Sequence, residues 1–136
     1  MIHTTNYTNT FIEIAADCPV SQAQTPPEKK TKTLANLQYE QIIKEPYQYS
    51  SDDIVFECYA VKNDISDSEK SQARIDFFSK GQPCLRCSPL AKRYGFGIHH
   101  NETGKVAIFP VESDEYQKFL SDDTVKKVKA MRSKKI

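Results

Sequence analysis

The segment of residues 93–111, RYGFGIHHNETGKVAIFPV, constrains the fold more than any other part of the sequence. Its two apolar runs flank Asn-Glu-Thr-Gly, a turn sequence with glycine where the backbone needs a positive φ. The pattern predicts a β-hairpin. Because successive side chains of a strand point to opposite faces, the first strand has an apolar face and a bare face. The apolar face consists of Tyr94, Phe96, Ile98 and His100, and the bare face of Gly95, Gly97 and His99.

The N-terminal part is expected to supply a strand, a long loop and a helix. Residues 10–15, TFIEIA, are rich in β-branched and aromatic residues and predict a strand. Residues 17–32 carry three prolines and little to bury. They predict a mobile Pro/Lys-rich loop that lies over the surface or covers a site. Thr33 caps an expected helix that ends near Lys44, because Pro46 follows.

Residues 52–62 allow two interpretations. The alternation of apolar side chains suits a buried strand, whereas the preceding Ser-Ser-Asp-Asp is a strong helix start, since acidic residues are favourable at the positive end of the helix dipole. We predict a helix over residues 52–62, ended by Asn63 in a left-handed conformation. A capping-box pattern at Ser66 and Glu69 predicts the next helix.

The remaining elements lie on both sides of the hairpin. We predict helices over residues 67–80 and 122–132, a short helix that Ser113 caps and that runs through Leu120, and an extended segment over residues 84–87. Together the elements predict one α+β domain over residues 1–136. A small antiparallel sheet around the 93–111 hairpin packs against four to five helices.

Composition limits the class of protein rather than its function. The chain has 136 residues, of which 38% are hydrophobic and 27% charged, as in a globular domain. No run approaches the roughly 20 apolar residues of a membrane span, and the first ten residues lack the basic and apolar regions of a signal peptide. We therefore expect a cytoplasmic protein with no membrane partner, whose four cysteines are reduced thiols.

The bare face of the hairpin is the first candidate site. Its exposed backbone, ending in an imidazole, can be the floor of a ligand pocket or can receive a closely packed helix. Basic residues near it in the sequence favour an anionic small molecule, such as a phosphate or carboxylate compound. The predicted lining is Arg86, Lys92, Arg93, Gly95, Gly97, His99 and Lys105. The glycine motifs of phosphate and dinucleotide loops are absent, and no cofactor is predicted.

An alternative is a hydrolase- or transferase-like enzyme. Histidine suits general acid/base catalysis because its ordinary pKa is near neutral, which makes His99 and His100 catalytic candidates. Asp53 and Glu57 lie one turn apart if residues 52–62 are helical, so they are the candidate carboxylates. The favourable effect of acidic residues at a helix start explains much of the same pattern without catalysis.

Cys84 and Cys87 form a C-x-x-C pair. A zinc site would need further ligands, for which His99 and Cys58 are the candidates. A thioredoxin-type redox pair lies at the N-terminus of a helix, and we expect no helix here because prolines flank the pair on both sides. The simplest interpretation is two thiols in an irregular strand, without a metal.

The two halves of the chain differ in charge. Residues 1–79 hold 7 Lys/Arg and 12 Asp/Glu, whereas residues 80–136 hold 12 and 6. The basic C-terminal half, with six basic residues in 126–135, could attract nucleic acid, and a solvated terminal helix is the simpler interpretation. An unpaired strand at the edge of the hairpin would favour a homodimer.

Five segments together resemble a known family. They are TNYTNTFIEIAADCP, YSSDDIVFE, FFSKGQPCLR, KRYGFGIHHNETGK and VESDEY. The family consists of small uncharacterised microbial proteins catalogued as a domain of unknown function, and the resemblance implies a complete protein without an assigned activity. The hairpin and the lysine-rich C-terminal segment more faintly resemble YdhG-type α+β proteins, some described as frataxin-like iron chaperones. Frataxins bind iron with an acidic ridge on a helix and a strand. This sequence has no dense acidic ridge beyond Asp52, Asp53 and Glu57.

Overall fold

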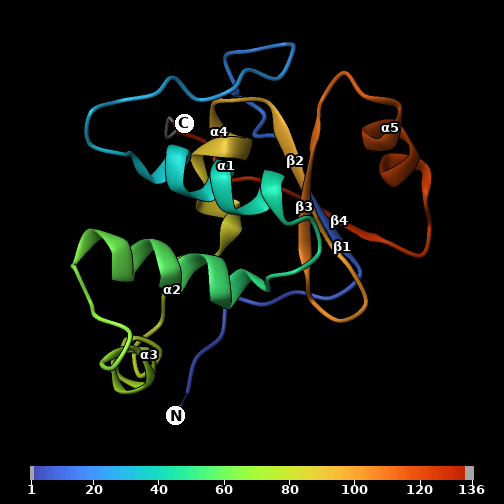
Figure 1. Ribbon diagram of the computed structural model, residues 1–136. Coiled ribbons are helices and arrows are strands. Elements are labelled where there is room, and N and C mark those ends of the chain that lie inside the picture. The colour runs from blue at the N-terminus through green and yellow to red at the C-terminus, as the bar shows by residue number, and fades with distance from the viewer. Residues whose placement is uncertain (1, 134–136) are drawn as a thin grey trace.

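The computed structural model describes residues 2–133 of the chain. These residues form a four-stranded sheet of order β3-β2-β1-β4, with helices on both of its faces (Figure 1). The strands are β1 (Thr10–Glu13), β2 (Phe96–His100), β3 (Val106–Pro110) and β4 (Lys126–Lys129). The helices are α1 (Leu34–Lys44), α2 (Ser51–Lys62), α3 (Lys70–Phe77), the 3-10 helix η1 (Leu85–Cys87), α4 (Pro89–Lys92) and α5 (Asp114–Ser121). The predicted α+β class is confirmed.

The predicted hairpin is confirmed and lies within the sheet. β2 pairs antiparallel with β3 on one side and with β1 on the other. In the turn between β2 and β3, Gly104 has a φ of 81° and its N–H donates to the carbonyl of Asn101 at 3.0 Å. β4 runs parallel to β1, so the sheet is mixed rather than antiparallel as predicted.

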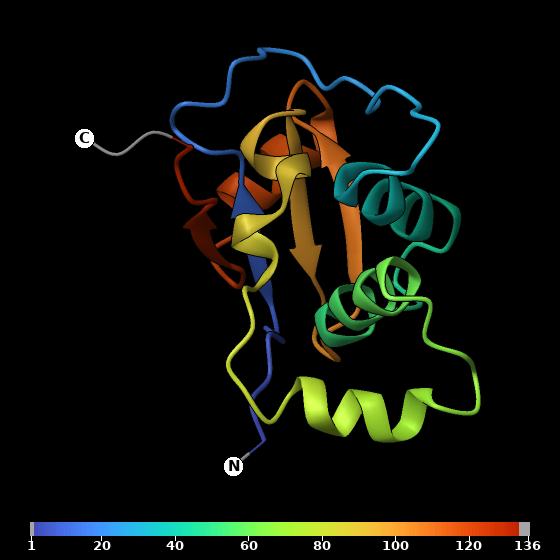
Figure 2. The same cartoon turned by 90° about the vertical axis from the view of Figure 1, so that its left-hand side faces the viewer.

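One face of the sheet carries the main hydrophobic core. Figure 2 shows α4, coloured yellow, in front of the sheet, with α1 and α2 beside it. The predicted apolar face of β2 points into this core. The core residues include Ile12, Ile98, Val106 and Ile108 from the strands and Leu37, Ile42, Ile54 and Leu90 from the helices.

The second face of the sheet is covered by α5, which Ser113 caps as predicted. Phe11 of β1 and Tyr116 of α5 form the centre of a separate aromatic cluster, with ring centroids 4.9 Å apart. Phe119 stacks on the Phe11 ring at 5.0 Å. The two faces of β1 therefore belong to different cores.

Side-chain caps begin the first two helices where the sequence predicts. The Thr33 hydroxyl accepts from Asn36 N at the start of α1. The Ser50 hydroxyl accepts from Asp53 N at the start of α2, which confirms the helical interpretation of residues 52–62. The end of α2 differs from the prediction: Asn63 has a φ of −109°, and the positive φ falls on Asp64.

The helix predicted over residues 67–80 is shorter than expected. Ser66 and Glu69 form the predicted contact, with Ser66 Oγ donating to Glu69 Oε1 at 2.6 Å. Residues 67–69 form a turn, and α3 extends only from Lys70 to Phe77. α3 packs on α2 through a third cluster formed by Phe56, Ala60 and Phe78.

The extended segment predicted over residues 84–87 is wrong. Residues 85–87 form η1, and Ser88 caps α4 by accepting a hydrogen bond from Leu90 N at 3.2 Å. Pro89 stands in the first turn of α4, where its missing N–H costs no hydrogen bond. Proline, taken from the sequence as a barrier to helix formation, starts a helix here.

The helix predicted over residues 122–132 is also wrong. The Asp122 carboxylate accepts hydrogen bonds from N and Oγ1 of Thr124, at 2.9 and 2.6 Å, which closes a local turn. The chain then pairs with β1, and Ala130 N donates to Glu13 O at 2.9 Å. By pairing with β1, residues 126–129 provide partners for the N–H and C=O groups on that edge of β1, which a terminal helix would leave without partners. Residues 134 and 135 of the basic segment lie outside the described residues.

Residues 17–32 contain neither helix nor strand, as predicted. This loop packs against the start of β2, where Gln24 N donates to Tyr94 O at 2.9 Å. Ala23 N donates to the Glu112 carboxylate at 3.0 Å. The loop therefore covers the residues that precede β2, and its predicted mobility stays a prediction.

Candidate functional site

Aromatic side chains fill the bare face of the hairpin. A Cβ atom on Gly97 would overlap the Phe11 ring and lie 2.6 Å from Tyr116 Cε2. Tyr116 is fixed in this place because its hydroxyl accepts a hydrogen bond from Ile14 N at 3.0 Å. Gly97 thus lets two rings approach the strand, which agrees with the packing alternative rather than with an open ligand floor.

Gly95 lies under the loop of residues 17–32. Its φ is 79°, and a Cβ atom on it would lie 3.0 Å from Val20 Cγ2 and 3.1 Å from Ala23 Cα. Both predicted glycines of the anion site are buried by other parts of the chain.

His99 lies in a mainly aromatic environment. Its Nδ1 is 2.9 Å from the Tyr47 hydroxyl, and its ring stacks on Phe119 with centroids 4.1 Å apart. Burial lowers the pKa of His99, and the nearby Asp122 charge acts in the opposite direction. The imidazole is therefore positioned by a phenol and a phenyl ring rather than by the predicted basic residues.

His100 is a core residue. Its exposed fraction is 0%, and neither ring nitrogen has a hydrogen-bond partner within residues 2–133. Its ring meets that of Tyr7 edge-on at 5.3 Å. Burial lowers the pKa of His100 to about 4, so the imidazole is neutral at physiological pH.

The basic residues predicted to line the anion site have separate environments. Arg86 Nε donates to Lys129 O at 2.8 Å beside β4. Lys92 and Arg93 stand at the end of α4, and Lys105 follows the hairpin turn. Within residues 2–133, none of these side chains forms a hydrogen bond with His99, whose hydrogen-bond partner is the Tyr47 hydroxyl.

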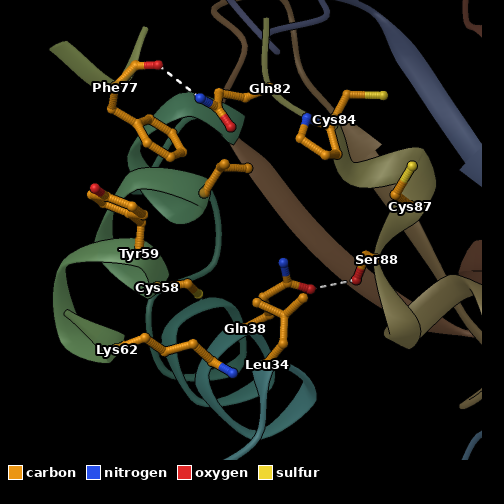
Figure 3. Close-up of a pocket in the computed structure, with 12 residues that line it drawn as sticks. Leu34, Gln38, Cys58, Tyr59, Lys62, Phe77, Gln82, Cys84, Cys87 and Ser88 are labelled. Atoms are coloured by element: carbon orange, nitrogen blue, oxygen red, sulfur yellow. Dashed lines mark hydrogen bonds between the residues drawn. The ribbon is translucent and has the colours of Figure 1, made fainter. Parts of the chain in front are cut away.

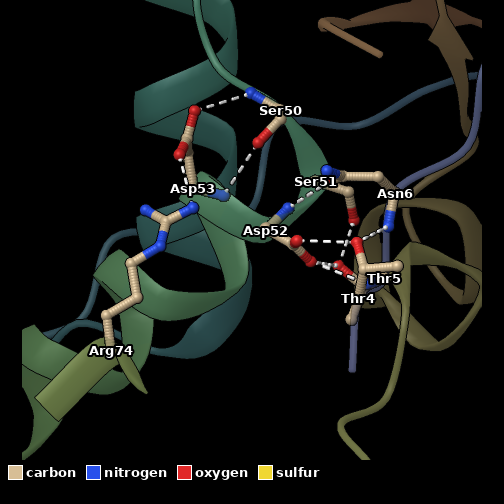
Figure 4. Close-up of polar contacts among 8 residues, drawn as sticks. All are labelled: Thr4, Thr5, Asn6, Ser50, Ser51, Asp52, Asp53 and Arg74. Carbon is tan, nitrogen blue, oxygen red and sulfur yellow. Dashed lines mark hydrogen bonds and ion pairs between the residues drawn. The ribbon is translucent and has the colours of Figure 1, made fainter. Parts of the chain in front are cut away.

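The candidate carboxylates belong to ion pairs on α2 and α3. Asp53 Oδ1 is 2.9 Å from Arg74 Nη2 (Figure 4), and Glu57 Oε1 is 3.3 Å from Lys70 Nζ. Burial raises the pKa of Asp53, and hydrogen bonds from Ser50 and Arg74 outweigh it and hold that pKa below its usual range. Asp53 and Glu57 line an open polar groove of about 610 Å³ without a histidine.

Asp52 has a structural role. Its carboxylate accepts hydrogen bonds from Thr5 N at 2.6 Å and from the hydroxyls of Thr4 and Thr5 at 2.7 Å each. Its own N–H donates to the Asn6 side chain at 2.9 Å (Figure 4). The start of α2 thereby fixes the N-terminal segment, which the sequence alone did not suggest.

A largely apolar cavity of about 230 Å³, open to solvent, lies between α1, α2 and the segment that carries η1 (Figure 3). Its walls are mainly hydrocarbon and sulfur. The lining residues are Leu34, Gln38, Val55, Cys58, Tyr59, Lys62, Phe77, Gln82, Pro83, Cys84, Cys87 and Ser88. α1 and α2 supply half of them, and the turn of residues 82–88 supplies the opposite wall.

Gln38 is the best placed polar side chain of this cavity. Its exposed fraction is 4%, and its Oε1 accepts a hydrogen bond from the Ser88 hydroxyl at 2.5 Å. This bond leaves the amide nitrogen directed toward the space between α2 and η1 (Figure 3). Lys62 also lines the cavity and contributes an ammonium group. The cavity thus combines apolar walls with two donors.

Three of the four cysteines line the cavity. Cys58 is buried, and burial raises the pKa of its thiol to about 12, so it stays protonated. Cys84 is half-buried and Cys87 is exposed. Within residues 2–133, no group of three or more His, Cys, Asp or Glu side chains is arranged to hold a metal ion.

Of this lining, only Cys58, Cys84 and Cys87 are site candidates in the sequence, and the other lining residues were missed. The missed residues come from three separate parts of the chain, and their apolar character is that of ordinary core residues. One signal was available: Gln38 interrupts the apolar stripe of α1 with a polar side chain that must find a partner when buried.

The comparisons with known proteins give a family and no activity. The chain belongs to a family of unknown function (DUF6157), whose model matches residues 2–136. No curated protein and no solved structure matches the chain significantly, so the fainter resemblance to YdhG-type proteins gains no support. Within residues 2–133, no helix is long and apolar enough to cross a membrane.

Proposed function

We propose that this family member binds a small, mainly apolar molecule with one acceptor group, a carbonyl or a carboxylate, in the cavity between α1, α2 and η1. The observation that carries the proposal is the buried Gln38, whose amide nitrogen faces apolar walls while its oxygen is bound by Ser88. Within residues 2–133 the amide nitrogen has no hydrogen-bond acceptor, and it is not sealed from water, because the cavity is open to solvent. A ligand acceptor would take the place of water on this donor, beside apolar walls that strengthen a hydrogen bond.

The size and chemistry of the cavity define the ligand class. Roughly 150 Å³ of apolar cavity holds a benzene molecule, so about 230 Å³ has room for one aromatic ring and a short polar substituent. Tyr59 and Phe77 supply aromatic wall area, and their ring centroids are 4.6 Å apart. Lys62 adds a positive charge, which favours a carboxylate over an amide.

Neither alternative function gains a specific observation. The predicted enzyme needs a carboxylate within about 3 Å of an imidazole. Asp53 and Glu57 instead pair with Arg74 and Lys70, and His100 is sealed in the core. The basic C-terminal segment contributes the edge strand β4, where lysines also discourage unwanted strand pairing. Nucleic-acid binding and a homodimer stay predictions.

Thermal unfolding with benzoate, benzamide and benzene as probes tests the proposal. A ligand that binds only the native state raises the melting temperature, and at about one hundred times Kd it adds about 2.7 kcal/mol to the free energy of unfolding. We expect the largest shift for benzoate and the smallest for benzene, because benzene leaves the Gln38 donor unsatisfied.

Val55→Phe and Val61→Phe form a matched pair for the same experiment. Val55 lines the cavity, whereas Val61 lies on the same helix with an exposed fraction of 49% and does not line it. We expect Val55→Phe to abolish the thermal shift and Val61→Phe to retain it. Equal shifts in both variants, or no shift in the unchanged protein with any of the three probes, would show that this cavity is not the binding site.

A further inference from the structure

Cys84 and Cys87 lie at the two ends of a single 3-10 turn. Cys84 is the residue that precedes η1 and Cys87 is its last residue, and Cys87 N donates to Cys84 O at 3.0 Å. Side chains at positions i and i+3 of a 3-10 helix eclipse one another. In Figure 3 the two sulfur atoms accordingly project from the same side of η1.

This spacing suits a disulfide bond. A turn closed by a hydrogen bond between residues i and i+3 keeps its end Cα atoms within about 7 Å, and disulfides join Cα atoms about 4.4–6.8 Å apart. The backbone spacing of this turn is therefore compatible with a disulfide between the two cysteines. The hydrogen-bonded turn replaces the irregular strand that the sequence suggested.

The protein holds this turn in place from both sides. Leu85 anchors it in the main core with 1% exposure, and Ser88 is bonded to Gln38. Arg86 binds the end of β4 twice: its Nε donates to Lys129 O, and its carbonyl accepts from Met131 N, both at 2.8 Å. These contacts hold the backbone that carries Cys84 and Cys87 in a fixed position.

Tyr7 gives Cys84 a hydrogen-bonding partner that Cys87 does not share. The Tyr7 hydroxyl oxygen is 3.1 Å from Cys84 Sγ. Burial, followed by the hydrogen bond with Cys84, raises the pKa of Tyr7 to about 12, so the phenol keeps its proton at neutral pH and can donate it to sulfur. Cys84 is half-buried beside this donor, whereas Cys87 is exposed to reagents in solution.

We propose that Cys84 and Cys87 form a reversible dithiol–disulfide site that exchanges with low-molecular-weight disulfides. The Cys87 thiolate attacks one sulfur of the external disulfide, forms a mixed disulfide and releases the first thiolate. The Cys84 thiolate then attacks Cys87 Sγ, closes the internal disulfide and releases the second thiolate. The two leaving thiolates take up the protons that the cysteines lost. The protein pair is oxidised, and the external disulfide is reduced to two thiols.

The other two cysteines are internal references for this reaction. Cys58 is buried, with a thiol that stays protonated, and the thiolate is the reactive form. Cys18 is half-buried in the loop of residues 17–32 and belongs to no C-x-x-C pair. A general sensitivity to oxidants would modify Cys18 as well, whereas a dithiol site acts through Cys84 and Cys87 alone.

Incubating the native protein in buffers of reduced and oxidised glutathione, followed by alkylation and peptide mass spectrometry, tests the proposal. We expect an internal Cys84–Cys87 disulfide in the unchanged protein and in Cys18→Ser. Cys84→Ser should stop at a stable glutathione adduct on Cys87. In Cys87→Ser we expect Cys84 to react about tenfold more slowly than Cys87 does in Cys84→Ser, because it is less accessible.

Tyr7→Phe tests the positioning role of the phenol. It removes the hydroxyl and keeps the ring that packs on His100. We expect the first step on Cys87 to keep its rate and the mixed disulfide to accumulate because closure slows. Glutathione adducts on both cysteines without an internal disulfide would overturn the proposal, as would an internal disulfide that forms only after denaturation. Val61→Phe lies outside the cavity that Cys84 and Cys87 line, so it should not affect the exchange and serves as the matched control.

Discussion

The β2–β3 hairpin and the turn of residues 82–88 both attract attention in the sequence, and the structure treats them in opposite ways. The hairpin concentrates glycines and histidines, yet Gly97 is covered by Phe11 and Tyr116 and His100 has no exposed surface. The 82–88 turn is short and irregular, yet it forms one wall of the apolar cavity and carries one exposed and one half-buried thiol.

A glycine in a strand and a space between packed elements are therefore two different features. A glycine in a strand leaves space that the rest of the chain can fill, and in the hairpin a neighbouring strand and a helix fill it. The cavity arises instead because side chains from α1, α2 and the turn do not meet. No local sequence pattern records that mismatch, since it depends on how distant elements pack.

The largest expected effect concerns His100 and pH. A histidine in an unfolded chain has a pKa near 6.5, whereas burial lowers the pKa of His100 to about 4. Between these values the unfolded state binds more protons, so the free energy of unfolding falls as the pH drops below about 6.5. The complete loss for this group is about 3 kcal/mol. Urea denaturation between pH 7 and pH 4.5 measures most of it.

His100→Leu is the control for this effect. Leucine has a similar size and no titrating group, so the variant should lose most of the pH dependence over that range. His99→Leu should keep it, because His99 is only half-buried. If the pH profile of His100→Leu matched that of the unchanged protein, His100 would not be buried as a neutral imidazole in the core.

Much of the fold could be predicted because local signals and packing agree. Thr33, Ser50 and Ser113 cap helices where serine or threonine precedes an apolar pattern, and the turn at Gly104 is where its glycine indicates. The errors occur where tertiary contacts decide. Val125, Val128 and Met131 have helical spacing in the sequence, and pairing with β1 makes residues 126–129 a strand.

The site was less predictable than the fold for the same reason. His99 and His100 were chosen for their chemistry, but their roles depend on Tyr47, Phe119 and burial, which come from other elements. The C-x-x-C pair was recognised, and its geometry was not, because flanking prolines were read as preventing a helix. The C-x-x-C spacing identifies the two thiols in the sequence. Only the structure shows that they lie at the two ends of one 3-10 turn.

Gly97→Ala gives the next largest effect and tests the closed face of the hairpin directly. The added methyl group would overlap the Phe11 ring and crowd Tyr116, both in a packed cluster. We expect a destabilisation of about 2 kcal/mol, typical of overpacking in a core, measured by urea denaturation. Phe11→Leu in the same chain should recover part of this loss relative to the sum of the single changes. A neutral Gly97→Ala would mean that the face is open after all.

The smallest change in the free energy of unfolding is expected in the cavity beside the 82–88 turn, at Val55. Val55→Ile adds one methylene group, as much carbon as Gly97→Ala, at a position that lines the cavity rather than a filled cluster. The new methylene enters space that contains no protein atoms, so the cost of overpacking does not apply, and we expect a change in the free energy of unfolding below about 0.5 kcal/mol in either direction. Urea denaturation of the two variants under one set of conditions compares the regions with the same added volume. A loss at Val55 as large as that at Gly97 would show that the cavity closes in solution, and the ligand proposal would lose its site.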